Sequence, residues 1–207
     1  MATPYWALRD TGVRVGFASI AGGAPTADPG SLGEEGSRKP AVQRFLDCQH
    51  AMQALRASRS ISDIEADQYD LVFLPGGHGT MWDFRQSDDL SHVIGRAFDR
   101  GAVVGAVCHG PAGLVDAQSA NGAPIVKGRR INAFTNAEER AVELADTVPY
   151  LLESELRNKG ALFEGTENFG AYAIRDGNLV TGQNPASVGA VTDLLIEAFR
   201  DSGLTAA

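Results

Sequence analysis

Cys108 and His109 are adjacent in the segment AVCHGP (Ala106–Pro111), and both side chains can take part in nucleophilic chemistry. The apolar run Gly101–Val107 precedes them and the residues GPAGL follow, a pattern typical of a strand, a sharp turn and a helix. In such a nucleophile elbow, the helix directs its first N–H groups at the reactive side chain. We therefore predict that Cys108 is a nucleophile whose thiol ionises readily. The alternative is a small buried residue of the core.

A cysteine nucleophile also needs a base that is held in place and donors for a developing oxyanion. Glu138 and Glu139 follow a predicted strand in the segment FTNAEER and could orient the base. In the alternative interpretation, Asn136 caps a helix and both glutamates interact with its positive end. Gly76 and Gly77 end the strand that precedes the elbow strand. Because the carboxyl ends of parallel strands meet at one edge of a sheet, we expect this turn to lie beside the elbow.

The histidines and cysteines show no metal-binding spacing. The sequence contains these residues of the two types: His50, His78, His92, His109, Cys48 and Cys108. They form no His-x-x-x-His or Cys-x-x-Cys pair, so the spacing predicts no metal site. His50 and His92 lie in helical patterns, and Cys48 is predicted to be a packing residue of a helix. His78 follows Gly77, where it could shape the turn. The segment PGGHGT matches neither glycine-rich phosphate-binding motif, which predicts no such cofactor.

The composition is that of an acidic protein. The net charge is −8 and the pI is about 5.0. With no basic stripe, this charge argues against a nucleic-acid or anionic-membrane partner. Two cysteines cannot form a disulfide framework, which indicates the reducing cytoplasm. The residues MATPYWALRD do not resemble a signal peptide, and no apolar run approaches the roughly 20 residues of a membrane span.

The 207 residues, 43% of them hydrophobic, suffice for one core, so we predict a single domain over residues 1–207. An excursion of loop and helix is expected at about 21–64. Within it, Ala21–Ser37 is rich in Gly, Pro and Ser and is predicted to be a loop, whereas Ala41–Ser60 has helical spacing.

Strand-like and helix-like patterns alternate along the chain. This alternation predicts an α/β fold with a doubly wound, mainly parallel sheet and helices on both faces. The predicted strands are Val13–Ser19, Asp70–Leu74, Gly101–Val107, Arg130–Phe134, Tyr172–Arg175 and Leu179–Thr181, the last two forming a hairpin. The predicted helices beyond the excursion are Ser87–Arg100, Glu138–Leu144, Tyr150–Lys159 and a final one that opens at Asn184-Pro185.

Four segments together resemble a known family. They are LPGGHGTMWDF (Leu74–Phe84), AVCHGPAGL (Ala106–Leu114), AFTNAEE (Ala133–Glu139) and LVTGQNPAS (Leu179–Ser187), in that order. The sequence resembles the ThiJ/PfpI superfamily, whose flavodoxin-like fold is related to that of class I glutamine amidotransferases. Within it, the similarity is greatest to the heat-shock-chaperone branch, which includes glutathione-independent glyoxalase III. The likeness extends from about Pro4 to Phe199.

The resemblance implies a catalytic triad in which Cys108 is the nucleophile, His109 its partner and Glu139 the acid. Glu139 is favoured over Glu138 because it ends the TNAEE segment. The backbone of Gly77 and that of His109 would form the oxyanion hole. The further positions implied to bind the oxyanion or the substrate are Gly76, His78, Asn184 and Pro185.

The function implied is that of a glyoxalase III-type lyase. Such an enzyme converts methylglyoxal-type 2-oxoaldehydes to D-lactate-type 2-hydroxy acids without glutathione, metal or another cofactor. Its partners would be a small aldehyde substrate and a second copy of itself in a homodimer. Two alternatives remain open: a chaperone or redox stress-response protein of low activity, and a cysteine amidase or peptidase.

The resemblance also indicates a departure at the N-terminus. The family begins with an additional strand and a loop glutamate, followed by a helix that carries a proline–aromatic pair like Pro4-Tyr5. Here the corresponding glutamate would fall immediately before Met1. We therefore expect Val13–Ser19 and Asp70–Leu74 to lack their usual neighbouring strand. Without this proton-transferring glutamate, we also expect slower turnover than in a chain that has it.

Overall fold

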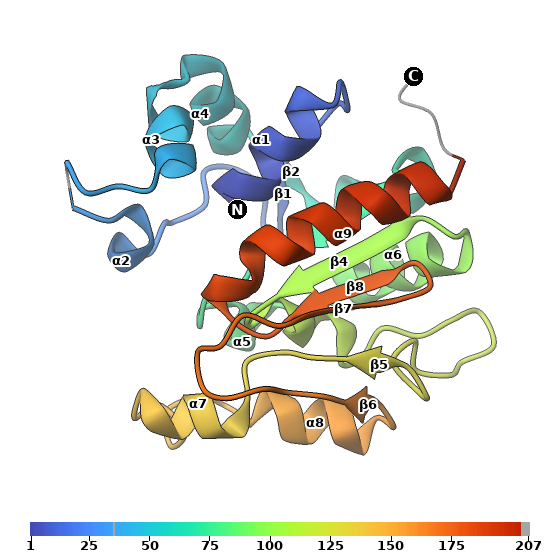
Figure 1. The fold of residues 1–207 in the computed structure, drawn as a ribbon. Coiled ribbons are helices and arrows are strands. Elements are labelled where there is room, and N and C mark those ends of the chain that lie inside the picture. The colour runs from blue at the N-terminus through green and yellow to red at the C-terminus, as the bar shows by residue number, and fades with distance from the viewer. Residues whose placement is uncertain (35, 204–207) are drawn as a thin grey trace. The chain divides into compact units, whose positions relative to one another are not determined.

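The structure is a computed structural model that describes residues 1–34 and 36–203 (Figure 1). It consists of two compact units, one formed by Met1–Ile64 and one that begins at Glu65. The boundary coincides with the end of the predicted excursion. The arrangement of all 207 residues as one domain stays a prediction. Every candidate site residue belongs to the second unit.

The first unit combines short helices with one strand pair. Its elements are α1 (Ala2–Asp10), β1 (Ala18–Ser19), α2 (Pro29–Leu32), α3 (Pro40–Asp47), α4 (Gln49–Arg56), β2 (Arg59–Ser60) and the 3₁₀ turn η1 (Ile61–Asp63). β1 and β2 pair in parallel. Tyr5, Phe17 and Phe45 form an aromatic cluster with ring centroids 5.1–5.9 Å apart.

The predicted strand Val13–Ser19 is wrong except for its last two residues. Val15 and Phe17 pack against the aromatic cluster rather than entering a ladder. The partner strand β2 is also only two residues long, so it offers no longer ladder. Alternation of apolar and polar residues can therefore mark a segment with one buried face that is not a strand.

The predicted loop and helix of the excursion are largely confirmed. Ala21–Ser37 contains one short helix, α2, which begins because the Asp28 side chain accepts the Gly30 N–H. The helical segment Ala41–Ser60 forms two helices, α3 and α4. They meet at Cys48, which has an extended backbone and therefore does not lie within a helix as predicted.

The second unit contains the main sheet. Its four strands are β3 (Leu71–Leu74), β4 (Val103–Val107), β7 (Ala173–Asp176) and β8 (Leu179–Gly182), in the order β3-β4-β8-β7. β3, β4 and β8 are parallel, and the hairpin partner β7 is antiparallel. This confirms an α/β fold with a mainly parallel sheet. β3 is an edge strand of this sheet, and β4 is its paired neighbour.

Helices and turns surround this sheet. The remaining elements are η2 (Ala66–Gln68), α5 (Thr80–Asp83), α6 (Asp88–Asp99), η3 (Gly110–Leu114), β5 (Arg130–Ile131), α7 (Asn136–Ala141), α8 (Leu152–Asn158), β6 (Leu162–Phe163), η4 (Pro185–Ser187) and α9 (Val188–Asp201). α9 covers one face of the sheet and α6 lies behind it (Figure 1). Val191 and Leu195 of α9 pack with Val107 and Val180 in the core.

The predicted strand Arg130–Phe134 is shorter in the structure, since only Arg130–Ile131 pairs with β6. Beyond it, the Asn132 N–H donates to the Thr181 hydroxyl at 2.9 Å. The Phe134 N–H donates to the carbonyl of Cys108, also at 2.9 Å. The chain thus passes along β8 and the elbow through single hydrogen bonds, and it leads directly into α7.

Among residues 1–34 and 36–203, none of the helices has both the length and the apolar character that crossing a membrane requires.

Candidate active site

Cys108 lies at a strained turn between β4 and η3. Its φ is +61°, in the left-handed region that residues with a side chain rarely adopt. The turn is held on both sides, because the Cys108 N–H donates to Gly182 and its carbonyl accepts from Phe134. Strain of this kind gathers at functional sites. The strand–turn–helix layout predicted for the elbow is confirmed, although the helix that follows is a five-residue 3₁₀ turn.

The turn after β3 approaches the elbow closely, as predicted. A Cβ atom on Gly76 would lie 2.6 Å from the carbonyl oxygen of Val107 and 2.7 Å from the Cβ of Cys108. Only glycine therefore permits this approach. Gly77, the next residue, has a φ of +126°. As a result, the backbone N–H groups of Gly77 and His109 both lie against the Cys108 sulfur.

His109 connects the thiol to a carboxylate. The Cys108 Sγ lies 3.2 Å from His109 Nδ1, and His109 Nε2 lies 2.8 Å from Glu139 Oε2. Both His109 and Glu139 are buried. The structure thus brings the three predicted triad residues together as a chain from sulfur through imidazole to carboxylate, which is the geometry that activates a nucleophile.

Glu138, next to Glu139, points into a different network. Its Oε2 accepts from the N–H and hydroxyl of Thr135, and its Oε1 accepts from the Phe169 N–H and the Asn184 amide. The Thr135 hydroxyl in turn accepts from the Glu138 N–H, which completes a capping box at the start of α7. The helix cap is therefore Thr135, not Asn136 as the alternative interpretation expected. Glu138 joins three segments of chain and does not contact the triad histidine by any of these bonds.

His78 binds the second oxygen of the same carboxylate. Its Nε2 lies 2.8 Å from Glu139 Oε1, and its ring centroid is 4.0 Å from that of His109. The His78 side chain is 35% exposed, whereas His109 is buried. The sequence placed His78 at this edge but gave it only a role in shaping the turn. Phe134, which sequence reasoning did not select, packs its ring 4.6 Å from His109; the motif AFTNAEE contains it and could have drawn attention to it.

The predicted opposite wall contains one buried and one exposed residue. The Asn184 side chain is fully buried and donates to Glu138 and to the carbonyl of Gly170. Its Oδ1 accepts the Ala186 N–H, which starts η4. Asn184 is thus tied to the Glu138 network, while Pro185 is exposed. Contact of either residue with substrate stays a prediction.

The charge state of the site differs from the expectation of a readily ionised thiol. Burial raises the pKa of the Cys108 thiol to about 12, and the negative charges of Glu138 and Glu139 add to this. The N–H groups of His109 and Gly77 oppose the shift but do not offset it. Burial also lowers the pKa of His109. The resting pair is therefore a neutral thiol beside a neutral imidazole, because burial outweighs the short helix that follows.

This protonation state predicts how Cys108 responds to an alkylating reagent. Since only the thiolate reacts and the pKa is about 12, the rate with iodoacetamide should rise about tenfold per pH unit from about pH 7 to pH 10. Peptide mass spectrometry after timed labelling measures this rate. A rate that levels off below about pH 8 would show that the thiol ionises readily after all.

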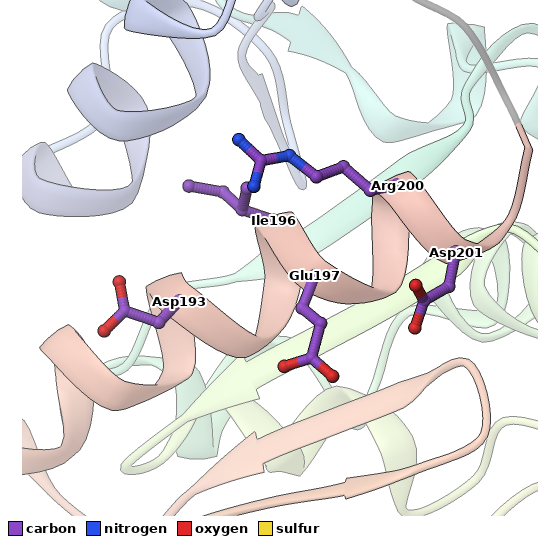
Figure 2. A pocket seen from close by; sticks show the side chains of 5 residues that line it. All are labelled: Asp193, Ile196, Glu197, Arg200 and Asp201. Atoms are coloured by element: carbon purple, nitrogen blue, oxygen red, sulfur yellow. The ribbon is translucent and has the colours of Figure 1, made fainter.

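A separate open hollow lies along α9. Figure 2 shows the five residues that line it: Asp193, Ile196, Glu197, Arg200 and Asp201. Glu197 and Asp201 form ion pairs with Arg175 of β7. The lining contains none of the nucleophile, base or acid groups described above. The chemistry of the molecule is therefore assigned to the elbow and not to this hollow.

A cysteine elbow at the carboxyl edge of a parallel α/β sheet, paired with a histidine and a glutamate, defines a class of cysteine-dependent proteins. The sequence profile of the DJ-1/PfpI family matches residues 1–198, and the chain belongs to this family.

The named relatives share one description. The chain is 32% identical to glyoxalase 3 of Candida albicans over 70% of its own length, and it spans 64% of that protein. It is 31% identical to the probable glutathione-independent glyoxalase hsp3103 of Schizosaccharomyces pombe, over 89% of this chain and 82% of that one. The crystal structure of glyoxalase III from Candida albicans matches with a TM-score of 0.87 at 28% identity, covering 95% of this chain and 84% of that one.

Proposed function

We propose that this protein is a glutathione-independent glyoxalase that converts methylglyoxal-type 2-oxoaldehydes to 2-hydroxy acids such as D-lactate. The observation that carries the proposal is the chain of contacts from Cys108 through His109 to Glu139. The names of relatives at about 30% identity support it. A redox-sensing role fits less well, because sensor thiols have a low pKa and are exposed, whereas Cys108 is 8% exposed with a raised pKa.

The first step is attack on the aldehyde. His109 Nδ1 takes the thiol proton while the Cys108 sulfur bonds to the aldehyde carbon. The electron pair of the C=O bond moves to oxygen, and the N–H groups of Gly77 and His109 are the donors for this oxyanion. His109 then returns the proton to that oxygen. The product is a neutral hemithioacetal, and the imidazole is neutral again.

The second step moves hydrogen between the two carbons. His109 removes the proton from the carbon bonded to sulfur, which gives an enediol, and then delivers a proton to the neighbouring carbon. The former aldehyde carbon is thereby oxidised to a thioester and the ketone carbon is reduced to an alcohol, so no external oxidant is needed. Water, activated by His109, finally cleaves the thioester and regenerates the Cys108 thiol. Glu139 orients the imidazole and stabilises its charged form throughout.

The test is a direct assay of D-lactate from methylglyoxal in the absence of glutathione. We expect the wild-type protein to form D-lactate, Cys108→Ala to form none, and Cys48→Ala to match the wild type. Cys48 is the matched control because it is the other cysteine and lies in the first unit, between α3 and α4. Absence of product from the folded wild-type protein, or activity that survives Cys108→Ala, would overturn the proposal.

A further inference from the structure

His78 makes contacts that the triad itself does not need. A triad acid has to hold one imidazole, and Glu139 does so through Oε2. Its other oxygen lies 2.8 Å from the Nε2 of His78. The two Nε2 atoms and the carboxylate therefore converge, and one ligand atom from each of the three residues lies within 4.8 Å of the others.

Two imidazole nitrogens and one carboxylate oxygen are a donor set that Zn²⁺ prefers, with a fourth position left for water or another small ligand. Zn–N and Zn–O bonds of about 2.0–2.2 Å place tetrahedral ligand atoms about 3.4 Å apart. The present separations, 2.8 Å and at most 4.8 Å, need shifts of about 1 Å or a little more to reach that spacing. His78 can supply much of this movement, because its side chain is partly exposed at the start of a turn.

Charge also favours a cation here. Glu139 bears one negative charge at the site, and Glu138 lies at the adjacent position with a pKa below its ordinary value. Burial by itself would raise the pKa of Glu138, but its hydrogen bonds from Thr135 and Asn184 outweigh this, so that the carboxylate is ionised. Two carboxylates thus surround the imidazoles with negative potential that a divalent cation would neutralise.

We propose that His78, His109 and Glu139 form a binding site for Zn²⁺ at the edge of the cysteine site. The ligands are the Nε2 atoms of both histidines and a carboxylate oxygen of Glu139. Sequence spacing could not show this set, because the three residues come from the turn after β3, the elbow and α7.

Occupation of this site has a chemical consequence for His109. A zinc ion on Nε2 leaves the single proton of the neutral ring on Nδ1, the atom that faces the Cys108 sulfur at 3.2 Å. Nδ1 then donates a hydrogen bond and cannot accept the thiol proton. Zinc would therefore switch off the base, a consequence that rests on the proposed function. The binding itself does not depend on that function.

Binding is measured without any activity, by titrating the metal-free protein with Zn²⁺ against a chromophoric chelator. We expect one Zn²⁺ per chain in the wild type and an affinity at least tenfold weaker in His78→Asn and in His78→Gln. His92→Asn is the matched control, since His92 is an exposed histidine of α6, and it should bind as the wild type does. Circular dichroism and melting temperature establish that each variant is folded.

A thiolate ligand is the competing explanation, and two measurements separate it. Cys108→Ala should keep the wild-type zinc affinity, and the Co²⁺-loaded protein should show visible bands of a tetrahedral N/O site without a strong thiolate charge-transfer band in the near ultraviolet. No one-to-one binding at 100 μM Zn²⁺, unchanged affinity in both folded His78 variants, or loss of binding in Cys108→Ala would overturn the proposal. A protein that binds zinc in this way but forms no D-lactate would refute the proposed function alone.

Discussion

Replacing Glu139 with glutamine should lower kcat for methylglyoxal by about 10²–10⁴-fold while the protein stays folded. The neutral amide cannot stabilise the imidazolium that forms when His109 takes the thiol proton, and it can accept from only one of the two imidazoles that contact Glu139. KM should change little, because Glu139 acts through His109. The rate of D-lactate formation measures the loss, and the melting temperature establishes folding.

Glu138→Gln is the control for this substitution, because it removes the neighbouring carboxylate with the same change of group. At equal folded fraction, its kcat should fall by less than tenfold, since Glu138 is hydrogen bonded to Thr135, Phe169 and Asn184 rather than to His109. Equal losses of kcat in the two folded variants would show that the triad acid has been assigned to the wrong residue.

Glu138→Gln should instead destabilise the fold, by about 3 kcal/mol at pH 7. The Glu138 side chain is fully buried and accepts from donors on three segments of chain. A glutamine replaces one accepting oxygen with an amide NH₂ group, which would face the N–H of Phe169 or Thr135 as donor against donor. Urea unfolding of the two proteins measures the difference.

Acidification should narrow this difference in stability. Burial would raise the pKa of Glu138, but the hydrogen bonds from Thr135 and Asn184 outweigh it and hold the pKa below 4.5. A lowered folded-state pKa contributes stability that is complete above the unfolded value and is lost as the pH falls through the folded value. The wild type should therefore lose its advantage below about pH 4.5. A gap that is the same at pH 7 and at pH 3.5 would contradict this account of Glu138.

The parts of the site that depend on local pattern could be predicted from the sequence. A buried strand, a cysteine at the turn and a glycine-rich start to the next element place Cys108 at the elbow, because these features involve neighbouring residues only. The same holds for the hairpin β7–β8, which has a turn sequence between two short apolar runs. In these places one interaction range, a few residues, decides the structure.

The parts that could not be predicted depend on distant segments. His78 and Glu139 are 61 positions apart, and nothing in the spacing shows that one imidazole would bind the acid of another. The raised pKa of Cys108 follows from burial, which the whole fold decides, so that the expectation from the elbow alone was wrong. The choice between Glu138 and Glu139 likewise rested on resemblance, since adjacent carboxylates at a helix start have the same local pattern.

The two adjacent glutamates also have a consequence for product release. After burial, their negative charges are what raises the pKa of Cys108, which means that they disfavour added negative charge at the sulfur. In the proposed reaction, the aldehyde enters uncharged, whereas the 2-hydroxy acid is formed as an anion beside Cys108. The same repulsion then acts on the product and not on the substrate. The site thus binds its starting material in preference to its product, and turnover ends in expulsion.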